Sequence, residues 1–397
     1  MQRLLIPILA ISLMLTMNCA AQQTQESKQP AASQTAATAS PQVGGEAAVT
    51  LVRKATSGGQ KPEFLSVTLL PGRGMNTFQI TANIPGKGEI PLLNSPSLAE
   101  AAARLTLDGR DKFGNGSYTL GGAFLVPYPN RVLGTVSADG QTISTSWHGH
   151  TLVLPANAGG RNPQSKYAMH GLILGSKAVD LNLQQARDGQ TETGTIHAGN
   201  FGDHWLSDTD LHFTVALAGQ TVDVTITAKN VGKEAEPMAI GWHPYFLIPS
   251  GDRSQARLHV PAAKIAVANE SIPTGVLTPV EGTVYDYRLP EGVPLGDHAL
   301  DTNFSEFKRT DRAINVQIVD PKSHYGIEVQ GLSPEIKTVQ VYSPTNSHFV
   351  AVEDQFNFPD PFGEQWKGMD TGMVTLRPGQ SVTWKVRLHL FTPDSKL

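Results

Sequence analysis

The stretch from Asp210 to Val231 reads DLHFTVALAGQTVDVTITAKNV, and it contains two runs in which apolar and polar residues alternate. The apolar positions of the two runs are Leu211, Phe213, Val215, Leu217, Val222, Val224 and Ile226. A period of two places all of these side chains on one face of a β-strand. The glycine-containing segment Ala218-Gly219-Gln220 lies between the runs, so the stretch predicts an antiparallel hairpin with one face toward the core.

Similar short runs recur along the chain and are separated by Pro-Gly turn signals. They cover Phe64–Leu70, Phe78–Ile84, Thr142–Trp147, Ala313–Val319, Gly326–Val329, Thr338–Tyr342 and Val382–Leu390. Helix signals are few: Ser97 and Glu100 form a capping box ahead of residues 98–105, and Gly109 is expected to end that helix. The regular strand–helix alternation of Rossmann folds and βα barrels is missing. We therefore predict an all-β fold, a large antiparallel sandwich with few short helices.

Charge and cysteine content exclude several classes of protein. The formal net charge is −4, from 31 basic and 35 acidic residues, so no charge field indicates a nucleic-acid partner. The chain has a single cysteine, which excludes an internal disulfide framework and a zinc site built from several thiolates.

The first 21 residues have the features of an export signal. Arg3 supplies a positive charge, and residues 4–17 form an apolar stretch that is shorter than the roughly 20 residues needed to span a bilayer. Cys19, Ala20 and Ala21 follow, and two processing routes stay open. Either Cys19 becomes a lipid-modified N-terminus, as in bacterial lipoproteins, or a signal peptidase cleaves after one of the two alanines. The expected location is therefore the periplasm, either free or attached to a membrane through Cys19.

Residues 22–48 are rich in Gln, Ala, Ser and Thr, and Val43 is their one β-branched aliphatic residue. Such a segment buries too little apolar surface to offset the entropy of ordering, so we expect a disordered linker. At about 150 residues per domain, 397 residues would allow two or three domains. No second linker follows, however, and we predict one β-sandwich domain over residues 49–397.

Two histidines lie in segments that favour contact with a ligand. In Met169-His170-Gly171 the glycine would let a ligand approach the imidazole, although a solvated loop histidine is the alternative. In Gly241-Trp242-His243-Pro244-Tyr245-Phe246, Pro244 favours an extended backbone at His243. The surrounding aromatic rings could pack on the apolar face of a sugar while the imidazole meets its hydroxyls. A core histidine beneath an aromatic cluster is the alternative for His243.

Glu353 follows the apolar run Phe349-Val350-Ala351, which predicts a strand. Partial burial at the end of such a strand would raise the pKa of the carboxyl group toward that of a useful base. The alternative is a carboxylate on the surface at the end of the strand.

His148-Gly149-His150 raises the question of a metal, because His-x-His within a strand places both imidazoles on one face. No third ligand is indicated nearby, so we predict no metal site. The chain also lacks a Gly-x-Ser-x-Gly elbow, and Cys19 lies in the signal region. Serine and cysteine nucleophiles are therefore not indicated.

Taken in chain order, six segments resemble elements of the aldose 1-epimerase (galactose mutarotase) family over roughly residues 50–395. They are Pro127–Val132, Met169–Gly171, Gly241–Phe246, Pro273–Arg288, Leu300-Asp301 and Glu353–Gln355. Gly241–Phe246 is the most specific, since it looks like the His-Pro-Tyr-Phe element of the family. In two places the chain departs from the family pattern: Asp354 stands where proline or threonine is frequent, and Leu172 where a second glycine is common.

The resemblance implies a β-supersandwich with a sugar-sized cleft, and interconversion of the α and β anomers of an aldohexose such as glucose or galactose without a cofactor. It implies that Glu353 is the base that deprotonates the anomeric hydroxyl and that His243 is the acid that protonates the ring oxygen. Substrate binding is implied for Arg131, His170, Asp301, Asn130 and Gln355. Asp301 is also expected to support the positive charge on His243.

Three other functions remain open on the same residues. A non-catalytic carbohydrate-binding module would need the cleft but not the pair of Glu353 and His243. A sugar-phosphate epimerase should show further Arg or Lys side chains around the cleft. A glycoside hydrolase would use Glu353 and Asp301 as its two carboxylates. The sequence specifies no oligomeric state.

Overall fold

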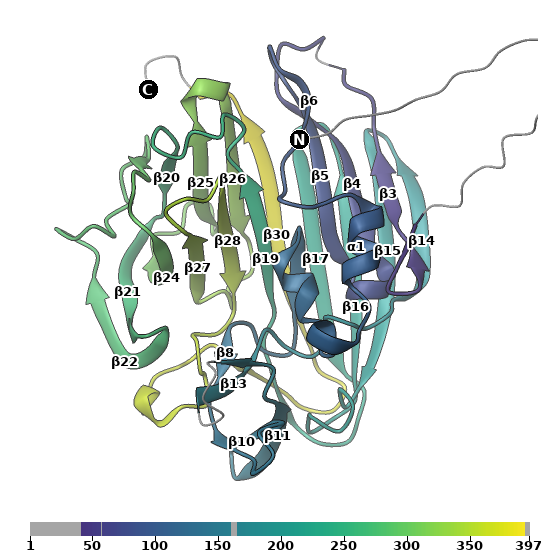
Figure 1. The fold of residues 1–397 in the computed structure, drawn as a ribbon, viewed down its shortest axis with the longest axis vertical. Helices are drawn as coiled ribbons and strands as arrows, with labels where there is room; N and C mark the ends of the chain where they lie inside the picture. The colour runs from purple at the N-terminus through teal and green to yellow at the C-terminus, as the bar shows by residue number, and fades with distance from the viewer. Residues whose placement is uncertain (1–40, 57, 160–164, 394–397) are drawn as a thin grey trace, which may run out of the picture. The chain divides into compact units, whose positions relative to one another are not determined.

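The computed structural model describes residues 41–56, 58–159 and 165–393, and Figure 1 shows it as a ribbon. Most of these residues lie in β-strands or in the turns between them. Neighbouring strands of the two largest sheets pair antiparallel, as predicted. The predicted signal segment with Cys19, and the linker up to residue 40, lie outside the described residues.

Two sheets contain most of the strands. The larger has the order β14 (Val179–Ala186), β15 (Gly189–Gly199), β16 (Thr209–Leu217), β17 (Thr221–Asn230), β30 (Ser381–Phe391), β26 (Tyr325–Gly331), β25 (Ile314–Asp320), β20 (Arg257–His259) and β23 (Val293–Pro294). The seven-stranded sheet has the order β22 (Ile272–Pro279), β21 (Ala262–Asn269), β24 (Leu300–Phe307), β27 (Thr338–Ser343), β28 (Phe349–Gln355), β19 (Gly241–Leu247) and β7 (Gly122–Leu125).

A four-stranded sheet and several small ones complete the fold (Figure 1). The four-stranded sheet has the order β3 (Val49–Val52), β4 (Glu63–Leu70), β5 (Asn76–Ile84) and β6 (Gly88–Pro91). The small sheets are β11 (His150–Pro155), β10 (Thr142–Trp147) and β9 (Thr135–Val136); β12 (Ala158–Gly159), β13 (Lys166–Met169) and β8 (Arg131–Val132); β1 (Gln42–Val43) and β2 (Glu46–Ala47); and β18 (Glu236–Met238) and β29 (Val374–Leu376). The helical segments are α1 (Leu98–Arg104) and the 3-10 turns η1 (Pro71–Arg73), η2 (Gly109–Asp111), η3 (Asn115–Thr119), η5 (Pro321–Ser323) and η6 (Glu364–Trp366).

The hairpin predicted from residues 210–231 is present as β16 and β17, paired from Thr209 with Asn230 to Leu217 with Val222. Its alternating apolar side chains are buried, and the residues between them are partly or fully exposed. Aromatic side chains connect the two largest sheets across the core. Trp384 of β30 lies 6.5 Å from Trp242 of β19, and Phe213 of β16 lies 5.5 Å from Phe124 of β7, measured between ring centroids.

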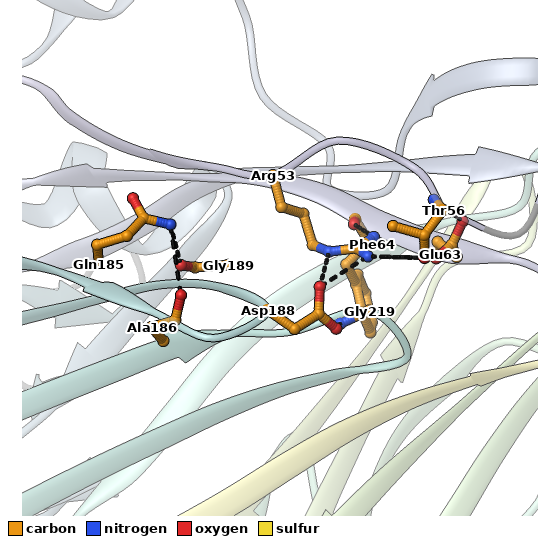
Figure 2. A network of polar contacts seen from close by, with 9 residues as sticks. All are labelled: Arg53, Thr56, Glu63, Phe64, Gln185, Ala186, Asp188, Gly189 and Gly219. Atoms are coloured by element: carbon orange, nitrogen blue, oxygen red, sulfur yellow. Dashed lines mark hydrogen bonds and ion pairs between the residues drawn. The ribbon is translucent and has the colours of Figure 1, made fainter.

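The four-stranded sheet contacts the larger sheet through β3 and β4, and a buried arginine fixes one end of that contact (Figure 2). The Arg53 guanidinium donates to Asp188 Oδ1 from Nε at 3.0 Å and from Nη2 at 2.9 Å. The same group donates to Glu63 Oε1 at 3.2 Å and to the Phe64 carbonyl at 3.0 Å. Asp188 accepts in turn from the Gly219 amide at 2.9 Å. The network therefore joins β4 to the β14–β15 and β16–β17 turns.

The predicted linker boundary at residue 48 is wrong for residues 42–48. Residues 42–47 form the short hairpin of β1 and β2, whose turn is made by two glycines with positive φ. The Val43 side chain is fully buried in a cluster with Leu70, Phe78 and Leu105. The apolar surface that this segment lacks by itself is thus supplied by distant residues.

Two smaller expectations also differ from the structure. The capping box at Ser97 and Glu100 is present, but α1 ends at Arg104 rather than near Gly109, because Leu105 leaves the helical conformation and buries its side chain. His148 is not on a strand face: it adopts a positive φ of 49° in the turn between β10 and β11. Its ring stacks on Trp147 at 4.3 Å instead. In the described part of the chain, no helix has both the length and the apolar character to cross a bilayer.

Candidate active site

One face of the seven-stranded sheet forms a wall of a cavity of about 270 Å³. Six of the residues predicted for the site line this cavity: Asn130, Arg131, His170, His243, Asp301 and Glu353. The volume is close to the lower bound of roughly 300 Å³ for small-molecule sites, which suits a ligand of the size of a monosaccharide.

Strand register places His243 opposite Glu353. Gly241 of β19 pairs with Gln355 of β28, and Tyr245 pairs with Ala351. His243 and Glu353 lie midway between these two pairs and therefore face each other. His243 Nε2 lies 3.2 Å from Glu353 Oε1. Pro244 has no amide hydrogen, and the ladder between the two strands is interrupted around it. The imidazole and the carboxyl group therefore meet as cross-strand neighbours.

Successive side chains of β19 alternate between the core face of the sheet and the face that lines the cavity. Trp242 and Phe246 are fully buried on the core side, where Trp242 packs near Phe124 and Trp384. His243 and Tyr245 point to the other face and line the cavity. The two rings stack at 4.6 Å, which holds the imidazole in place beside Glu353.

The pair of His243 and Glu353 is almost completely desolvated, with exposed fractions of 5% and 2%. Burial raises the pKa of Glu353 well above its usual value, and the negative charge of Asp301 raises it further. Burial also lowers the pKa of His243. Both shifts favour the neutral groups, so the pair retains a single proton that either Oε1 or Nε2 can hold.

Gln355 does not line the cavity, contrary to its predicted contact with substrate. It is fully buried, and its Nε2 donates to Glu353 Oε2 at 2.8 Å. This hydrogen bond lowers the pKa of Glu353 and so opposes the effect of burial. Gln355 fixes the orientation of the carboxyl group from behind the cavity wall.

Asp301 acts on a different group from the one expected. Its carboxylate accepts from Gln340 Nε2 at 2.7 Å and from Ser271 Oγ at 3.0 Å. The carboxyl group in contact with His243 is that of Glu353, whereas Asp301 shifts the pKa of Glu353. The expectation that Asp301 supports the charge on His243 is therefore replaced by a direct effect on the base.

Gln340 fixes Asp301 and Asn130 relative to each other. Its Oε1 accepts from Asn130 Nδ2 at 3.3 Å and from Asn303 Nδ2 at 3.2 Å, while its Nε2 donates to Asp301. Because the oxygen has two donors and the nitrogen has an acceptor, the orientation of the amide is determined. Gln340 also pairs with Glu353 across β27 and β28.

Arg131 reaches the cavity from β8. The preceding Asn130 adopts a positive φ of 60°, and its side chain accepts from the Arg131 amide at 3.0 Å. The Arg131 guanidinium donates to the Ser271 carbonyl and lies 5.7 Å from the centre of the Tyr167 ring. The Asp360 amide donates to the Arg131 carbonyl at 2.6 Å, which anchors the strand that carries the guanidinium.

His170 enters through a turn that requires the following glycine. Gly171 has a φ of 76°, and a Cβ at this position would lie 2.3 Å from the Val126 carbonyl oxygen. The His170 ring lies 4.7 Å from Tyr118 and 5.2 Å from His243. Burial lowers the pKa of His170 well below its usual value, and His243 and Arg131 lower it further. His170 is therefore a neutral hydrogen-bonding group.

Several lining residues have no role predicted from the sequence. These are Tyr118, Thr119, Met169, Gln340 and Tyr342, whereas Tyr245 belongs to the aromatic cluster expected to pack on a sugar. A signal was present for Gln340 and Tyr342, because they alternate with valines in the predicted strand 338–342 and so share a polar face. Tyr118 comes from the turn η3, and no pattern in the sequence connects that turn to the cavity.

Two neutral proton carriers within hydrogen-bond reach suit acid/base chemistry on a hydroxylated ligand. One group can take a proton as the other gives one, and the transfer can then run in reverse. Within residues 41–56, 58–159 and 165–393, no three His, Cys, Asp or Glu side chains are placed to hold a metal ion.

Comparisons with known proteins bear on the family and the fold of the chain. A family model described as aldose 1-epimerase matches residues 100–389. A galactose mutarotase-like protein from Clostridium acetobutylicum superposes with a TM-score of 0.67 at 19% identity, covering 82% of this chain and 92% of its own. A putative aldose 1-epimerase from Escherichia coli K12 gives a TM-score of 0.60 at 16% identity, with 87% and 99% covered. No curated protein matches the sequence significantly. The structural neighbours, at these identities, establish the fold.

Proposed function

Because the chain belongs to the aldose 1-epimerase family, we propose that it is a mutarotase, which interconverts the α and β anomers of an aldohexose such as glucose or galactose. The observation that carries the proposal is the pair of His243 and Glu353, 3.2 Å apart and facing a polar cavity of monosaccharide size. A module that only binds sugar needs no such proton-sharing pair.

Ring opening uses the charged form of the pair, with the proton on His243. Glu353 takes the proton of the anomeric hydroxyl, and the C1–O1 bond becomes a carbonyl. The C1–O5 bond breaks, its electrons remain on the ring oxygen, and His243 Nε2 protonates that oxygen. The pair ends the step as a carboxylic acid and a neutral imidazole, which are the forms that burial favours.

Ring closure reverses these transfers on the other face of the carbonyl. Rotation about C1–C2 presents that face to the O5 hydroxyl. His243 takes the O5 proton as the oxygen attacks C1, and Glu353 returns a proton to O1. The pair regains its starting state, so the cycle consumes no co-reactant.

The neighbouring groups orient the sugar and adjust the base. Arg131 lowers the pKa of Glu353, which favours the ionised carboxylate that ring opening needs. Asp301 and Asn130, both held by Gln340, present oxygen and nitrogen atoms to hydroxyl groups. His170 is neutral and suits a hydrogen bond to a hydroxyl or to the ring oxygen.

The lining of the cavity argues against a phosphorylated substrate. Among the described residues that line it, Arg131 is the one with a lysine or arginine charge. A phosphate group is generally held by more than one cationic or amide donor. The positive charge of Arg131 and the negative charge of Asp301 balance each other in the lining, which suits a neutral sugar better than a sugar phosphate.

The test is mutarotation of α-D-glucose and α-D-galactose, followed by polarimetry above the spontaneous rate. We expect Glu353→Gln to lower kcat by at least ~100-fold, since an amide cannot accept the anomeric proton. The matched control is Glu281→Gln, an exposed carboxylate elsewhere, which should keep wild-type activity. Wild-type activity in Glu353→Gln would refute the assignment of the base.

We further propose that residues 1–21 direct export, and that Cys19 is either lipidated or removed with the signal. Mass spectrometry of the mature N-terminus separates the two routes. A diacylglycerol-modified Cys19 would indicate a lipoprotein, and an unmodified N-terminus at Ala21 or Gln22 a released protein. Retention of Met1 in the mature protein would contradict export by either route.

A further inference from the structure

A second cavity, of about 560 Å³, lies where β21 and β24 meet β20, β25 and β26. It shares no lining residue with the active-site cavity and has about twice its volume. Asp301 lines the active-site cavity and Phe307 lines the second cavity. The two residues are six positions apart on β24. An extended strand rises ~3.3 Å per residue, so their separation is at most about 20 Å. The two cavities can therefore hold ligands independently.

One side of this cavity is a polar array across three adjacent strands. His259 of β20 pairs with Gln317 of β25, which in turn pairs with Glu328 of β26. Gln317 Nε2 donates to Glu328 Oε2 at 2.6 Å, and Gln330 Nε2 donates to Glu328 Oε1 at 2.5 Å. The polar groups are thus fixed before any ligand arrives, so binding would cost little side-chain entropy.

Asn315 adds an acceptor that none of the described residues satisfies. It lies two residues before Gln317 on β25 and therefore on the same face. Its Oδ1 is buried and has no hydrogen-bond donor among the described residues. Since a buried carbonyl without a partner is costly, a turn of the Asn315 side chain toward the cavity, where a ligand hydroxyl could donate to this oxygen, would be favourable.

Apolar side chains form another part of the lining, here called the apolar wall, and the charges of the lining are balanced. Phe307, Pro261 and Pro290 supply ring faces of the kind that pack on the C–H face of a sugar. The charged side chains of the lining are two cations, Arg288 and Lys308, and two carboxylates, Glu306 and Glu328. Asp286 binds Arg288 through two hydrogen bonds of 2.7 Å, and Lys264 binds Glu306 at 2.9 Å. This balance favours a neutral ligand over a phosphate or an acidic sugar.

We propose that this cavity is a second, non-catalytic saccharide site that takes a neutral oligosaccharide of two or more rings. Its volume is twice that of the cavity suited to one ring, and its polar wall meets hydroxyls while its apolar wall meets ring faces. His259 Nδ1 donates to the Leu289 carbonyl at 2.9 Å, and the ring forms no ion pair with a carboxylate in the described part of the chain. The two carboxylates of the lining are also engaged, Glu306 by Lys264 and Glu328 by Gln317 and Gln330, so the site would bind sugar without converting it. The inference does not depend on the proposed mutarotase activity.

The test is calorimetric titration of the mature protein with four neutral trisaccharides: maltotriose, cellotriose, β-1,4-galactotriose and β-1,4-mannotriose. We expect at least one to bind, and excess glucose and galactose in the cell should not displace it. Gln317→Leu and Phe307→Ala should each weaken this binding at least tenfold and leave the mutarotation rate unchanged. Gln184→Leu, which replaces an exposed amide on β14, is the matched control.

Any of three results would overturn the proposal. None of the four trisaccharides binds; or binding is unchanged in both Gln317→Leu and Phe307→Ala; or trigalacturonate binds more strongly than the neutral compounds. Loss of trisaccharide binding in Arg131→Ala but not in Gln317→Leu would place the ligand in the active-site cavity instead. Because Phe307→Ala tests the apolar wall and Gln317→Leu the polar one, a folding defect in one variant leaves the other informative. If the protein showed no mutarotation but still bound a trisaccharide, only the proposed mutarotase activity would be rejected.

Discussion

Asp301 and His243 line the same cavity, but their contacts predict different kinetic roles. His243 touches the base and would protonate the ring oxygen, so His243→Asn should lower kcat by at least ~100-fold. Asp301 hydrogen-bonds to Gln340 and Ser271 and is available to sugar hydroxyls. Asp301→Asn should therefore raise KM about tenfold, the loss expected for a charge-assisted hydrogen bond, and change kcat far less.

A second readout distinguishes the two residues. The charge of Asp301 raises the pKa of Glu353, so its removal should lower that pKa. The acid limb of the kcat profile, which reports ionisation of the base, should then move to lower pH in Asp301→Asn. Polarimetric initial rates over a range of pH and sugar concentration measure both effects. If His243→Asn raised only KM and Asp301→Asn abolished kcat, the two roles would have to be exchanged.

At the scale of the elements, the contacts of Arg53 between the two sheets lead to a prediction about the free energy of unfolding. The Arg53 side chain is 2% exposed and contacts Glu63, itself 5% exposed, and Asp188 (Figure 2). Removal of one partner of a buried ion pair takes away the opposite charge, although Glu63 keeps its hydrogen bonds from Thr56. Arg53→Met should therefore lower the free energy of unfolding by about 3 kcal/mol, as measured by urea denaturation.

The control is an ion pair of the same type on the surface. Lys177 and Glu46 are 53% and 41% exposed, so Lys177→Met should cost less than about 1 kcal/mol. Equal losses in the two variants would mean that burial does not determine the strength of the Arg53 contacts.

At the scale of strands, the sequence predicts those elements that depend on the alternation of apolar and polar residues or on caps within a short segment. The hairpin of β16 and β17 follows from its own residues, and so does the capping box of α1. Val43 shows the limit, because its partners Leu70 and Phe78 lie far along the chain and no local pattern indicates that they bury it. Pairing across strands has the same limit: His243 and Glu353 are recognisable separately, but only the register of β19 and β28 makes them neighbours.

Across the whole molecule, the seven-stranded sheet serves both the core and the site. One face of β28 presents Glu353 and Gln355, and the other presents Val350, Val352 and Asp354. Asp354 is the exception on the core side, since it is 1% exposed and neither carboxyl oxygen has a hydrogen-bond partner among the described residues. The sheet thus buries a second carboxyl group at the position next to the proposed base in sequence, on the opposite face of β28.

This buried acid should make the stability of the fold depend on pH. Burial raises the pKa of Asp354 to about 8, against the ordinary value of 3.8 that it regains on unfolding. Between these values the folded chain keeps a proton that the unfolded chain has lost. The contribution of Asp354 to the free energy of unfolding is therefore full below about pH 4 and falls as the pH rises toward 8, by up to ~1.4 kcal/mol per pH unit.

The contribution of Asp354 can be isolated with an isosteric amide, which stays neutral at every pH. Asp354→Asn should be more stable than the wild type near pH 8, and the difference between the two proteins should shrink toward pH 5. Glu236, whose pKa burial also raises to about 8, contributes the same trend to both proteins and so cancels in the difference. Urea denaturation of wild type and variant from pH 5 to 8.5 measures it, and parallel curves would show that Asp354 ionises as easily in the folded chain as in the unfolded one.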